Sequence, residues 1–429
     1  MKISISGIRG VYGTDFFPQD VIRFCDGFSK LIKNGKCVIG RDTRTTGEMI
    51  EKLVSATLLE KGIDVQILGV TPTPVVFRKA RELGAGIVIT SSHNPLEWNG
   101  LKFIIEGRGI TEKELEVVKN ERNSNRPKLG KESIGISNYV SDAVKVIGKL
   151  EQEKYVTVDI GGGSAKYVAP ELLKEIGCQV TTINDELDTC TRGPDPTTDE
   201  LTELINKTKQ VGFAFDLDSD RMILVMNGKK KSSDITLGLG VVKAIKLGIK
   251  KFVLSLDSSI AVEKYITNHG GKVWRSKVGE ANVIQKMIEN DAEAGGEGSS
   301  GGFILKKFNM CRDGLLTSGL IASMIGDETI QNDIEFFESF SQIRDKISVE
   351  SNLHDRLISE IAERVGTKYE INQLDGIKIE INENTWSLIR KSNTEDIIRI
   401  STESNDKQLL EKVQKEMIEI VNDCHEQIK

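Results

Sequence analysis

A serine-rich turn is the first segment whose residue types could do chemistry. The apolar run 86–90 predicts a strand, and Ser-Ser-His-Asn-Pro follows directly at 91–95. The proline and asparagine of this segment favour a turn, which would expose a serine hydroxyl as a nucleophile. Lys102 could return to the same place and move a proton beside a phosphate on Ser92. From the local residues alone, an ordinary strand-to-loop transition is the simpler interpretation.

Three aspartates follow a second apolar run. Residues 211–215 predict a buried strand, and Asp216, Asp218 and Asp220 come directly after it. Their alternation brings three carboxylates within reach of one point. Oxygen ligands of this kind favour a hard cation such as Mg²⁺, which keeps water or phosphate oxygens in its remaining positions. A solvated acidic turn is the competing interpretation, but a buried strand leading into three aspartates argues against it.

Two further loops carry polar groups that could bind a sugar phosphate. The glycine-rich run 294–302 contains Glu297 and Ser299, which can hydrogen-bond sugar hydroxyls. Near the end of the chain, one short segment offers a guanidinium and three small donors suited to phosphate, namely Arg390, Ser392, Asn393 and Thr394. Composition alone also fits a flexible surface loop for the first segment and a polar hairpin turn for the second.

The elements that must position these loops form an internal repeat. Residues 36–41, 155–159 and 252–256 are apolar runs of strand type, each followed by a loop, a stretch of helical periodicity and a second strand-like run. Each helical stretch ends at a glycine, the residue that most readily adopts the left-handed conformation there, namely Gly62, Gly177 or Gly270. A crossover helix between two strands implies that the strands are parallel. The sequence therefore predicts an α/β protein with three related domains of repeated βαβ units.

The chain after about residue 342 breaks this pattern. Charged residues of helical type precede the strand-like runs 376–381, 386–390 and 397–402, and an amphipathic helix ends the chain. Strands and helices that do not alternate predict a small α+β domain. The predicted domains are 1–135 (α/β, serine loop), 136–233 (α/β, aspartate loop), 234–341 (α/β, glycine-rich loop) and 342–429 (α+β, arginine loop).

Composition and charge limit the class of protein. The 429 residues are too many for one ordinary core, and 38% hydrophobic with 28% charged residues is typical of a soluble globular protein. The net charge of -6 argues against nucleic acid as the main partner, and no apolar run is long enough to span a membrane. The N-terminus lacks the features of a signal peptide and the six cysteines are widely spaced, which predicts a reducing, cytoplasmic location.

The ordered motifs resemble those of the α-D-phosphohexomutase superfamily, which includes phosphoglucomutases, phosphomannomutases and phosphoglucosamine mutases. Thr-Ser-Ser-His-Asn-Pro at 90–95, followed by Asn-Gly-Leu-Lys at 99–102, is similar to the active-serine signature of that family. The resemblance implies that Ser92 carries a phosphate, with His93 beside it, and that Lys102 transfers protons. Ser-Gly-Ile-Arg-Gly at 6–10 is similar to an N-terminal family motif whose arginine, here Arg9, faces the phosphoserine.

The other loops resemble family motifs with departures. The aspartate loop is similar to DGDxDR, which implies that the three aspartates and a phosphate oxygen on Ser92 bind one Mg²⁺, with Arg221 on the substrate side. Residues 294–302 are similar to the sugar loop GGExSGH, but Gly301 replaces the histidine, so that histidine contact is not implied. Residues 390–395 are similar to RxSxTEP, and the segment containing Lys277 is similar to one near the substrate.

The resemblance implies a phosphohexomutase that interconverts hexose 6-phosphate and hexose 1-phosphate through a 1,6-bisphosphate, which also serves as activator. The sugar would be glucosamine, mannose or glucose phosphate, with glucosamine ranked first, and the protein would be a monomer or homodimer. Two alternatives stay open. A buried strand followed by Asp-Leu-Asp-Ser also resembles phosphatases of the haloacid-dehalogenase type, with Asp216 as nucleophile. The other alternative is a sugar-phosphate-binding protein without catalysis.

Overall fold

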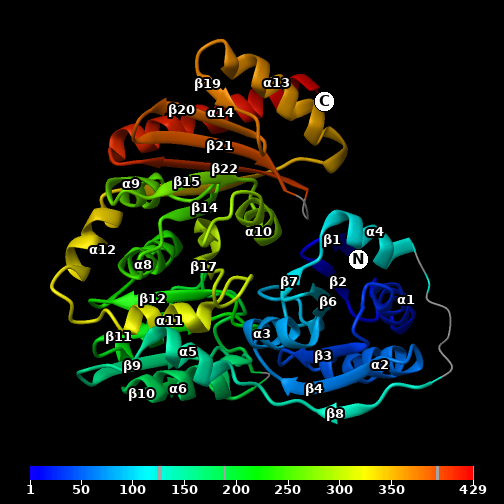
Figure 1. The fold of residues 1–429 in the computed structure, drawn as a ribbon. Helices are drawn as coiled ribbons and strands as arrows, with labels where there is room; N and C mark the ends of the chain where they lie inside the picture. Colours follow the sequence, from blue (N-terminus) through cyan, green and yellow to red (C-terminus); the bar gives the residue numbers. More distant parts are fainter. Residues whose placement is uncertain (121, 123–127, 188, 393–395, 429) are drawn as a thin grey trace.

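Four β-sheets follow one another along the chain, each with its own helices (Figure 1). We call the units around them domains I to IV: in the view of Figure 1, domain I lies at the right, II at the bottom, III above II, and IV at the top. The predicted fold class, three α/β domains followed by an α+β domain, is confirmed. No helix within the described ranges is long and apolar enough to cross a membrane. The structure is a computed structural model, and it describes residues 1–120, 122, 128–187, 189–392 and 396–428.

Domain I is a mixed sheet covered on both faces. Its strands run in the order β1-β2-β6-β5-β3-β4-β8, and β7 pairs with β6. Successive residues of β3 face opposite cores: Ile39 packs with α1 and α2, whereas Val38 packs with Val76 and Phe77 of α3. The elements are β1 Lys2–Ser4, β2 Gly7–Val11, α1 Pro18–Ser29, β3 Lys36–Arg41, α2 Gly47–Glu60, β4 Asp64–Val70, α3 Thr73–Leu83, β5 Ala85–Ile89, β6 Trp98–Ile105, β7 Arg108–Gly109, α4 Glu112–Asn120 and β8 Glu132–Ile134.

Domains II and III repeat the central plan of domain I. Their sheets are ordered β10-β9-β11-β12-β13 and β15-β14-β16-β17. In each domain three parallel strands are followed by one antiparallel strand, as in β4-β3-β5-β6 of domain I. The parallel part was predicted, but the antiparallel strand was not. The strands are β9 Lys154–Asp159, β10 Cys178–Ile183, β11 Val211–Phe215, β12 Met222–Met226, β13 Lys229–Lys230, β14 Lys251–Ser255, β15 Lys272–Ser276, β16 Ala294–Glu297 and β17 Gly302–Leu305.

One hydrophobic core joins domains II and III. It contains Phe213 of β11 and Phe303 of β17, and the two sheets are bridged by Leu239 of α8 and Leu316 of α11. Figure 1 shows α8 and α11 between the two sheets. The shared core ties the loops of these two domains to one rigid base. The helices are α5 Tyr139–Ile147, α6 Ala165–Ile176, α7 Thr202–Lys207, α8 Ser233–Lys246, α9 Ile260–Asn268, α10 Glu280–Glu289, the 3₁₀ turn η1 Gly298–Ser300, α11 Gly314–Ala322 and α12 Ile330–Glu338.

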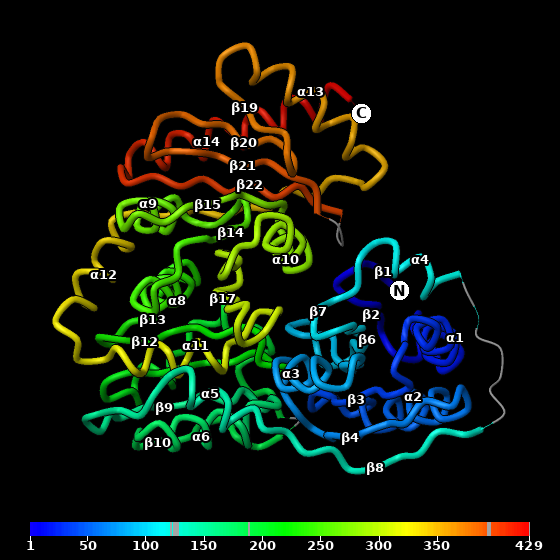
Figure 2. Tube along the Cα trace, in the orientation of Figure 1, coloured from blue at the N-terminus to red at the C-terminus, as the bar shows by residue number. Residues whose placement is uncertain are grey.

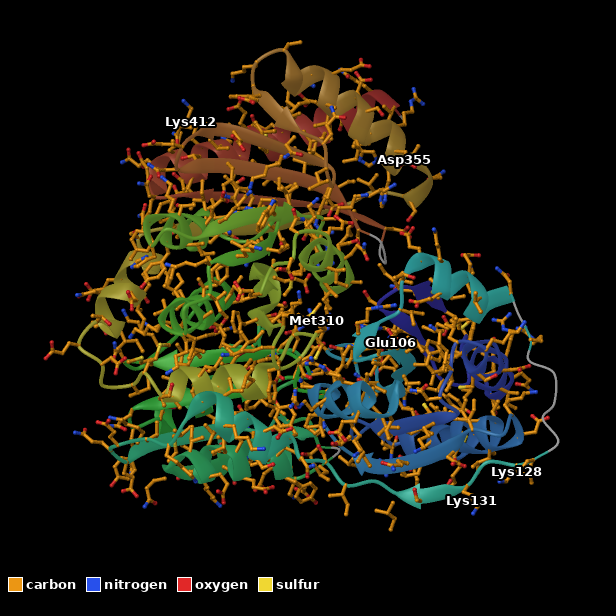
Figure 3. The ribbon with its side chains drawn as sticks, in the orientation of Figure 1. Glu106, Lys128, Lys131, Met310, Asp355 and Lys412 are labelled. Atoms are coloured by element: carbon orange, nitrogen blue, oxygen red, sulfur yellow. The ribbon has the colours of Figure 1, made fainter. Side chains whose placement is uncertain are left out.

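Domain I contacts this base along two routes. Figure 2 shows the chain leaving domain I through β8 and running beneath it into domain II. On the other side, an isolated bridge pairs Arg108 with Met310, and Figure 3 places Met310 between domains III and I, facing Glu106. Arg78 of α3 donates to Asp142 Oδ2 at 2.8 Å and to the Phe308 carbonyl at 2.7 Å. These contacts fix the edge of domain I against domains II and III.

Domain IV is an antiparallel sheet ordered β18-β22-β21-β20-β19 with two helices. The expectation that this segment begins with helix is wrong, because β18 comes first and pairs with β22 along its whole length. Most side chains of β18 are charged or polar and partly exposed, so its sequence lacks the apolar alternation that marks a strand. The elements are β18 Ser341–Ser348, the 3₁₀ turn η2 Ser351–Leu353, α13 His354–Gly366, β19 Glu370–Asn372, β20 Ile377–Asn382, β21 Thr385–Lys391, β22 Ile397–Ser404 and α14 Lys407–Ile428.

A buried carboxylate docks domain IV onto domain III. Glu403 of β22 accepts hydrogen bonds from the hydroxyl of Ser259, from the Ile260 backbone N–H at 2.8 Å, and from Trp386 Nε1 at 2.6 Å. Ile260 is the first residue of α9, so the carboxylate also faces the positive end of that helix. Trp386 packs against Leu256 beside these bonds. These contacts hold β21 and β22, the strands that carry Arg390 and Arg399, against domain III.

Candidate active site

Three loops at equivalent positions of the repeat meet between domains I, II and III. Each lies between the last parallel strand and the antiparallel strand of its sheet: the serine loop after β5, the aspartate loop after β11, and the glycine-rich loop after β16. Ser92 Oγ donates to Asp216 Oδ2 at 3.0 Å, which joins the first loop to the second. Arg312 joins the second loop to the third through Asp220 and Glu297. Carboxyl ends of parallel strands are where α/β proteins bind ligands.

The serine turn is strained and buried. Ser92 has φ 52°, in the left-handed region that non-glycine residues seldom occupy, and its backbone N–H donates to Thr90 Oγ1 at 2.8 Å. The turn was predicted, but the expected exposure of the hydroxyl is wrong, because Ser92 is 0% exposed. Its hydroxyl faces the aspartate loop of domain II. Strain of this kind, held by the surrounding structure, is common at reactive side chains.

A buried arginine from the loop after β3 holds the serine turn. Arg44 donates to the carbonyls of Ser92 and Asn94, both at 2.7 Å, and to those of Pro95 and Trp98. Its Nε is bonded to Asp42 Oδ2 at 3.0 Å. The sequence did not indicate the role of these two residues. The contacts show that Arg44 supports the conformation in which Ser92 is presented.

We expect Arg44→Lys to lower kcat by about ten- to a hundredfold with little change in KM, because a single ammonium cannot hold four carbonyls and the turn loses its geometry. Steady-state kinetics together with thermal unfolding would measure this. Arg41→Lys is the matched control, because the Arg41 side chain is paired with Glu51 and makes no hydrogen bond or ion pair with the described residues of the turn. Equal losses of kcat in the two variants would contradict a role of Arg44 in presenting Ser92.

The three aspartates form a site suited to a hard cation. Asp216, Asp218 and Asp220 are buried, and each offers a carboxylate oxygen within 4.8 Å of the others. Thr73 Oγ1 donates to Asp218 Oδ2 at 2.6 Å, and Lys102 Nζ donates to Asp220 Oδ2 at 3.1 Å. The Oδ1 atoms of Asp218 and Asp220 are buried without a hydrogen-bond partner. Buried carboxylate oxygens of this kind need a partner, and an all-oxygen set fits Mg²⁺.

The charges of the site are strongly coupled. Burial raises the pKa of Asp216 well above its usual value, and the neighbouring Asp218 and Asp220 raise it further. Burial also acts to raise the pKa of Asp220, but the cations Arg312 and Lys102 outweigh it and hold that pKa below its usual value. For Lys102, burial alone would lower the pKa, but Asp220 and Asp218 raise it, so the side chain stays an ammonium. The site therefore holds Lys102 charged between two aspartates.

Three more predicted residues lie beside the serine and aspartate loops. His93 Nδ1 lies 3.3 Å from Ser92 Oγ, and His93 Nε2 lies 3.4 Å from Arg221. Burial first, and then Arg221 and Arg9, hold the pKa of His93 well below its usual value, so the ring is neutral at physiological pH. Burial lowers the pKa of Arg9, while Asp218 and Asp220 act to raise it, which places Arg9 in the electrostatic field of the triad.

The glycine-rich loop is arranged around an arginine that the sequence did not reveal. Arg312 Nη1 donates to Glu297 Oε2 at 2.8 Å, and Arg312 Nη2 donates to Asp220 Oδ2 at 2.7 Å. Burial raises the pKa of Glu297, and Arg312 opposes that shift. Ser299 follows in η1 and is half-buried. No local pattern could have identified Arg312, because its partners come from other segments of the chain.

The remaining predicted residues lie outside this cluster. Arg390 stands opposite Arg399 on paired strands of domain IV, so the two guanidinium groups share one face of the sheet. Ser392 is buried and its N–H donates to the Ile397 carbonyl, whereas Asn393 and Thr394 lie outside the described residues. Lys277 is exposed, and its side chain makes no hydrogen bond or ion pair with any described residue. Of these residues, the ones that the structure describes, Arg390, Ser392 and Lys277, make no hydrogen bond or ion pair with Ser92.

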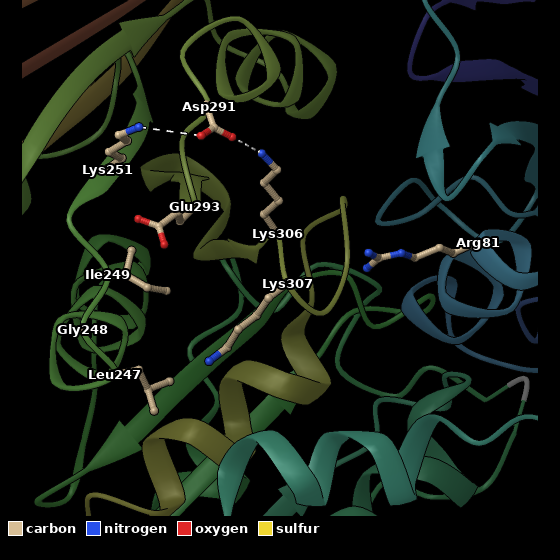
Figure 4. Close-up of a pocket in the computed structure, with 9 residues that line it drawn as sticks. All are labelled: Arg81, Leu247, Gly248, Ile249, Lys251, Asp291, Glu293, Lys306 and Lys307. Carbon is tan, nitrogen blue, oxygen red and sulfur yellow. Dashed lines mark hydrogen bonds and ion pairs between the residues drawn. The ribbon is translucent and has the colours of Figure 1, made fainter.

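A separate pocket of about 600 Å³ lies between α3 and domain III (Figure 4). Arg81 faces it from domain I, and Asp291 bridges Lys251 and Lys306 on the opposite side. Lys307 also lines it. None of the predicted site residues that the structure describes is part of its lining. The pocket is a surface hollow of mixed charge and is distinct from the cluster around Ser92.

Comparisons with known proteins agree with this arrangement. Models of the phosphoglucomutase/phosphomannomutase family match the chain in order: α/β/α domain I at residues 1–128, domain II at 137–229, domain III at 234–340 and the C-terminal domain at 350–420. A probable phosphoglucosamine mutase of Methanosphaera stadtmanae is 34% identical over 97% of both chains, and the phosphoglucosamine mutase of Methanococcus maripaludis is 32% identical over 98% of both. A crystal structure of a phosphoglucomutase/phosphomannomutase family protein from Burkholderia thailandensis superposes with a TM-score of 0.84 at 22% identity, over 98% of both chains.

Proposed function

Because the chain belongs to the phosphoglucomutase/phosphomannomutase family, and is therefore a phosphohexomutase, we propose that it interconverts glucosamine 6-phosphate and glucosamine 1-phosphate through a phosphate on Ser92. The observation that carries the proposal is the contact between the strained Ser92 hydroxyl and the buried aspartates of domain II. The choice of sugar rests on the phosphoglucosamine mutases that the chain resembles along almost its whole length.

In the first half-reaction, the bond between phosphorus and Ser92 Oγ breaks while a sugar hydroxyl forms a new bond to phosphorus. The hydroxyl proton must be taken up, and the Ser92 oxygen must receive a proton. The neutral His93 ring, 3.3 Å from Ser92 Oγ, would take up the proton of the sugar hydroxyl and deliver it to the Ser92 oxygen, so that the ring ends the step neutral. Lys102 stays an ammonium between the aspartates and stabilises charge beside the transferring phosphate. The reverse transfer from the other end of the 1,6-bisphosphate regenerates phospho-Ser92 and releases product.

Asp216, Asp218 and Asp220 would hold one Mg²⁺ per chain. The ion would neutralise charge on the phosphate during transfer. Arg9 and Arg221 lie on the same side of the site and would bind phosphate oxygens. Glu297 and Ser299 would bind the ring, and the basic face of domain IV around Arg390, with Ser392, Asn393 and Thr394, would hold the phosphate that is not reacting. Hexose 1,6-bisphosphate would act as activator by phosphorylating free Ser92.

Turnover of glucosamine, mannose and glucose 6-phosphates, measured with Mg²⁺ and trace hexose 1,6-bisphosphate, tests the proposal. We expect all activity to yield the 1-phosphate, with the highest kcat/KM for glucosamine 6-phosphate. Highest kcat/KM for mannose or glucose 6-phosphate would overturn the choice of sugar and leave the mutase activity intact. Free phosphate without sugar 1-phosphate would instead indicate a phosphatase that uses Asp216.

A further inference from the structure

Arg312 binds three carboxylates that come from three different segments. Its Nη2 holds Asp220 of the aspartate loop, and its Nη1 holds Glu297 at the end of β16. Its backbone N–H donates to Glu280 Oε2 at 2.8 Å, and its Nε lies 3.3 Å from the same oxygen. A guanidinium stays protonated in proteins, so Arg312 faces these carboxylates as a permanent cation. One cation therefore fixes three anions.

The chain around Arg312 leaves it little freedom. Gly302 lies directly against the side chain, since a Cβ there would stand 2.2 Å from Arg312 Cδ. The next residue, Asp313, caps α11 by accepting from the Leu316 N–H at 2.9 Å. Asp313 also accepts hydrogen bonds from Tyr139 and Asn309. The position of the guanidinium is thus set before any ligand binds.

Each of the three carboxylates is held by one oxygen and keeps the other for a further partner. Asp220 Oδ2 is engaged, and its buried Oδ1 has no hydrogen-bond partner. Glu297 and Glu280 are both held through Oε2, and neither Oε1 makes a hydrogen bond with any described residue. Glu297 is only 4% exposed, and a hydroxyl or amino group of a bound sugar could donate to its free Oε1. The free oxygen of Asp220 suits a metal ion, whereas those of Glu297 and Glu280 suit donors on the sugar.

Two carboxylates of this cluster lie close together and are paired with one cation. Glu280 and Glu297 share one guanidinium that is also committed to Asp220. After burial, the charges of Asp257 and Glu280 raise the pKa of Glu297, while Arg312 and Arg221 oppose that shift. A neutral hydroxyl can donate a hydrogen bond to such a pair but cannot balance its charge. A protonated amino group can do both, and charge-assisted hydrogen bonds are roughly twice as strong as neutral ones.

We propose that Glu280 is a specificity-determining residue that binds the protonated amino group of a hexosamine phosphate, and that Arg312 is the positioning residue that orients Glu280 and Glu297 for it. The proposal rests on the mutase function proposed above and assigns the discrimination between amino and neutral sugars to one carboxylate. Glu280 is the first residue of α10, next to the glycine-rich loop in space but apart from it in sequence.

The test compares kcat/KM for glucosamine 6-phosphate and glucose 6-phosphate in wild type and Glu280→Gln. The amide keeps the size of the side chain and removes its charge. We expect both values to fall, with glucosamine 6-phosphate losing at least about tenfold more, because a charged hydrogen bond is lost only for the amino sugar. Glu289→Gln is the matched control and should keep the wild-type ratio, because Glu289 lies at the far end of α10 and, within the described part of the chain, is paired only with Gln285 and Lys286.

Arg312→Lys tests the positioning role. Lysine keeps one positive charge but cannot hold three carboxylates. We therefore expect Arg312→Lys to lose the preference for glucosamine 6-phosphate over glucose 6-phosphate, as Glu280→Gln does. If Arg312 acts through Glu280, the double variant Glu280→Gln/Arg312→Lys should discriminate between glucosamine and glucose 6-phosphates no worse than either single variant. Independent structural effects of the two substitutions would instead add. Calorimetric titration of Mg²⁺ into Arg312→Lys should also show weaker binding through Asp220.

The outcomes separate this inference from the function on which it rests. A wild type that isomerises neither sugar would overturn the proposed function and this inference together. A wild type that prefers glucosamine 6-phosphate, with an unchanged preference in Glu280→Gln, would overturn the role of Glu280 alone. Additive losses of discrimination in the double variant would show that Arg312 does not act through Glu280.

Discussion

Ser92→Gly should lose mutase turnover by at least about 10³-fold while the protein remains folded, because removal of a covalent nucleophile has effects of this size or larger. Glycine removes the hydroxyl and also relieves the left-handed backbone at this position, where φ is 52°. The variant should therefore be at least as stable as wild type. Loss of activity in it could not be explained by unfolding. Steady-state turnover and thermal unfolding on the same preparations would measure both quantities.

The adjacent serine provides the control. Ser91 is also 0% exposed, but its Oγ accepts a hydrogen bond from Asn94 and does not reach Asp216. Ser91→Ala should retain most of the activity. Peptide mass spectrometry should place the phosphate on Ser92, in a form that survives hydroxylamine. Turnover close to wild type in Ser92→Gly, or a hydroxylamine-sensitive phosphate on Asp216, would exclude the phosphoserine mechanism.

The repeat explains why so much of the site could be predicted from the sequence. Each functional loop follows a short apolar strand, and such strands are visible as runs of buried residues before polar ones, as at 86–90 and 211–215. Because β5 and β11 belong to different sheets, strand patterns alone did not predict that their loops meet, and only the resemblance to the phosphohexomutase family implied it. The contact of Ser92 with Asp216 and that of Lys102 with Asp220 bring the predicted serine and aspartate loops together.

Residues that act through contacts distant in sequence could not be predicted. Arg312 holds Asp220, 92 residues away, and Arg44 holds the carbonyl of Ser92, 48 residues away. Neither arginine lies in a local pattern that distinguishes it from a surface arginine. The same reason applies to β18, whose polar sequence becomes a strand only because β22 offers it a paired edge. Burial of Ser92 likewise results from packing between domains, which a turn motif does not encode.

Removal of divalent metal should abolish turnover, and the aspartate triad should account for the loss. We expect excess EDTA to stop isomerisation and Mg²⁺ to restore it. Mg²⁺ should also stabilise the folded protein, by about 2.7 kcal/mol at a concentration of 100 times its Kd, because it binds only the folded site. Asp218→Asn removes one charge from the triad and replaces the free Oδ1 with a weaker ligand. This variant should lose both the activity and most of the stabilisation by Mg²⁺.

Asp159→Asn is the control variant. It separates the loss of Mg²⁺ binding from the general destabilisation caused by removing a buried carboxylate. Asp159 ends β9, the strand next to β11, and is paired with Arg192 at 2.9 Å. The Asp159→Asn substitution should lower the free energy of unfolding by similar amounts with and without Mg²⁺, because it leaves the aspartate triad intact. The increase in melting temperature on adding Mg²⁺ should therefore survive in Asp159→Asn and disappear in Asp218→Asn. Turnover that persists in excess EDTA would contradict a metal site in the aspartate loop. An equal increase in melting temperature with Mg²⁺ in the two variants would contradict it too, and the two buried Oδ1 atoms would then have no explanation.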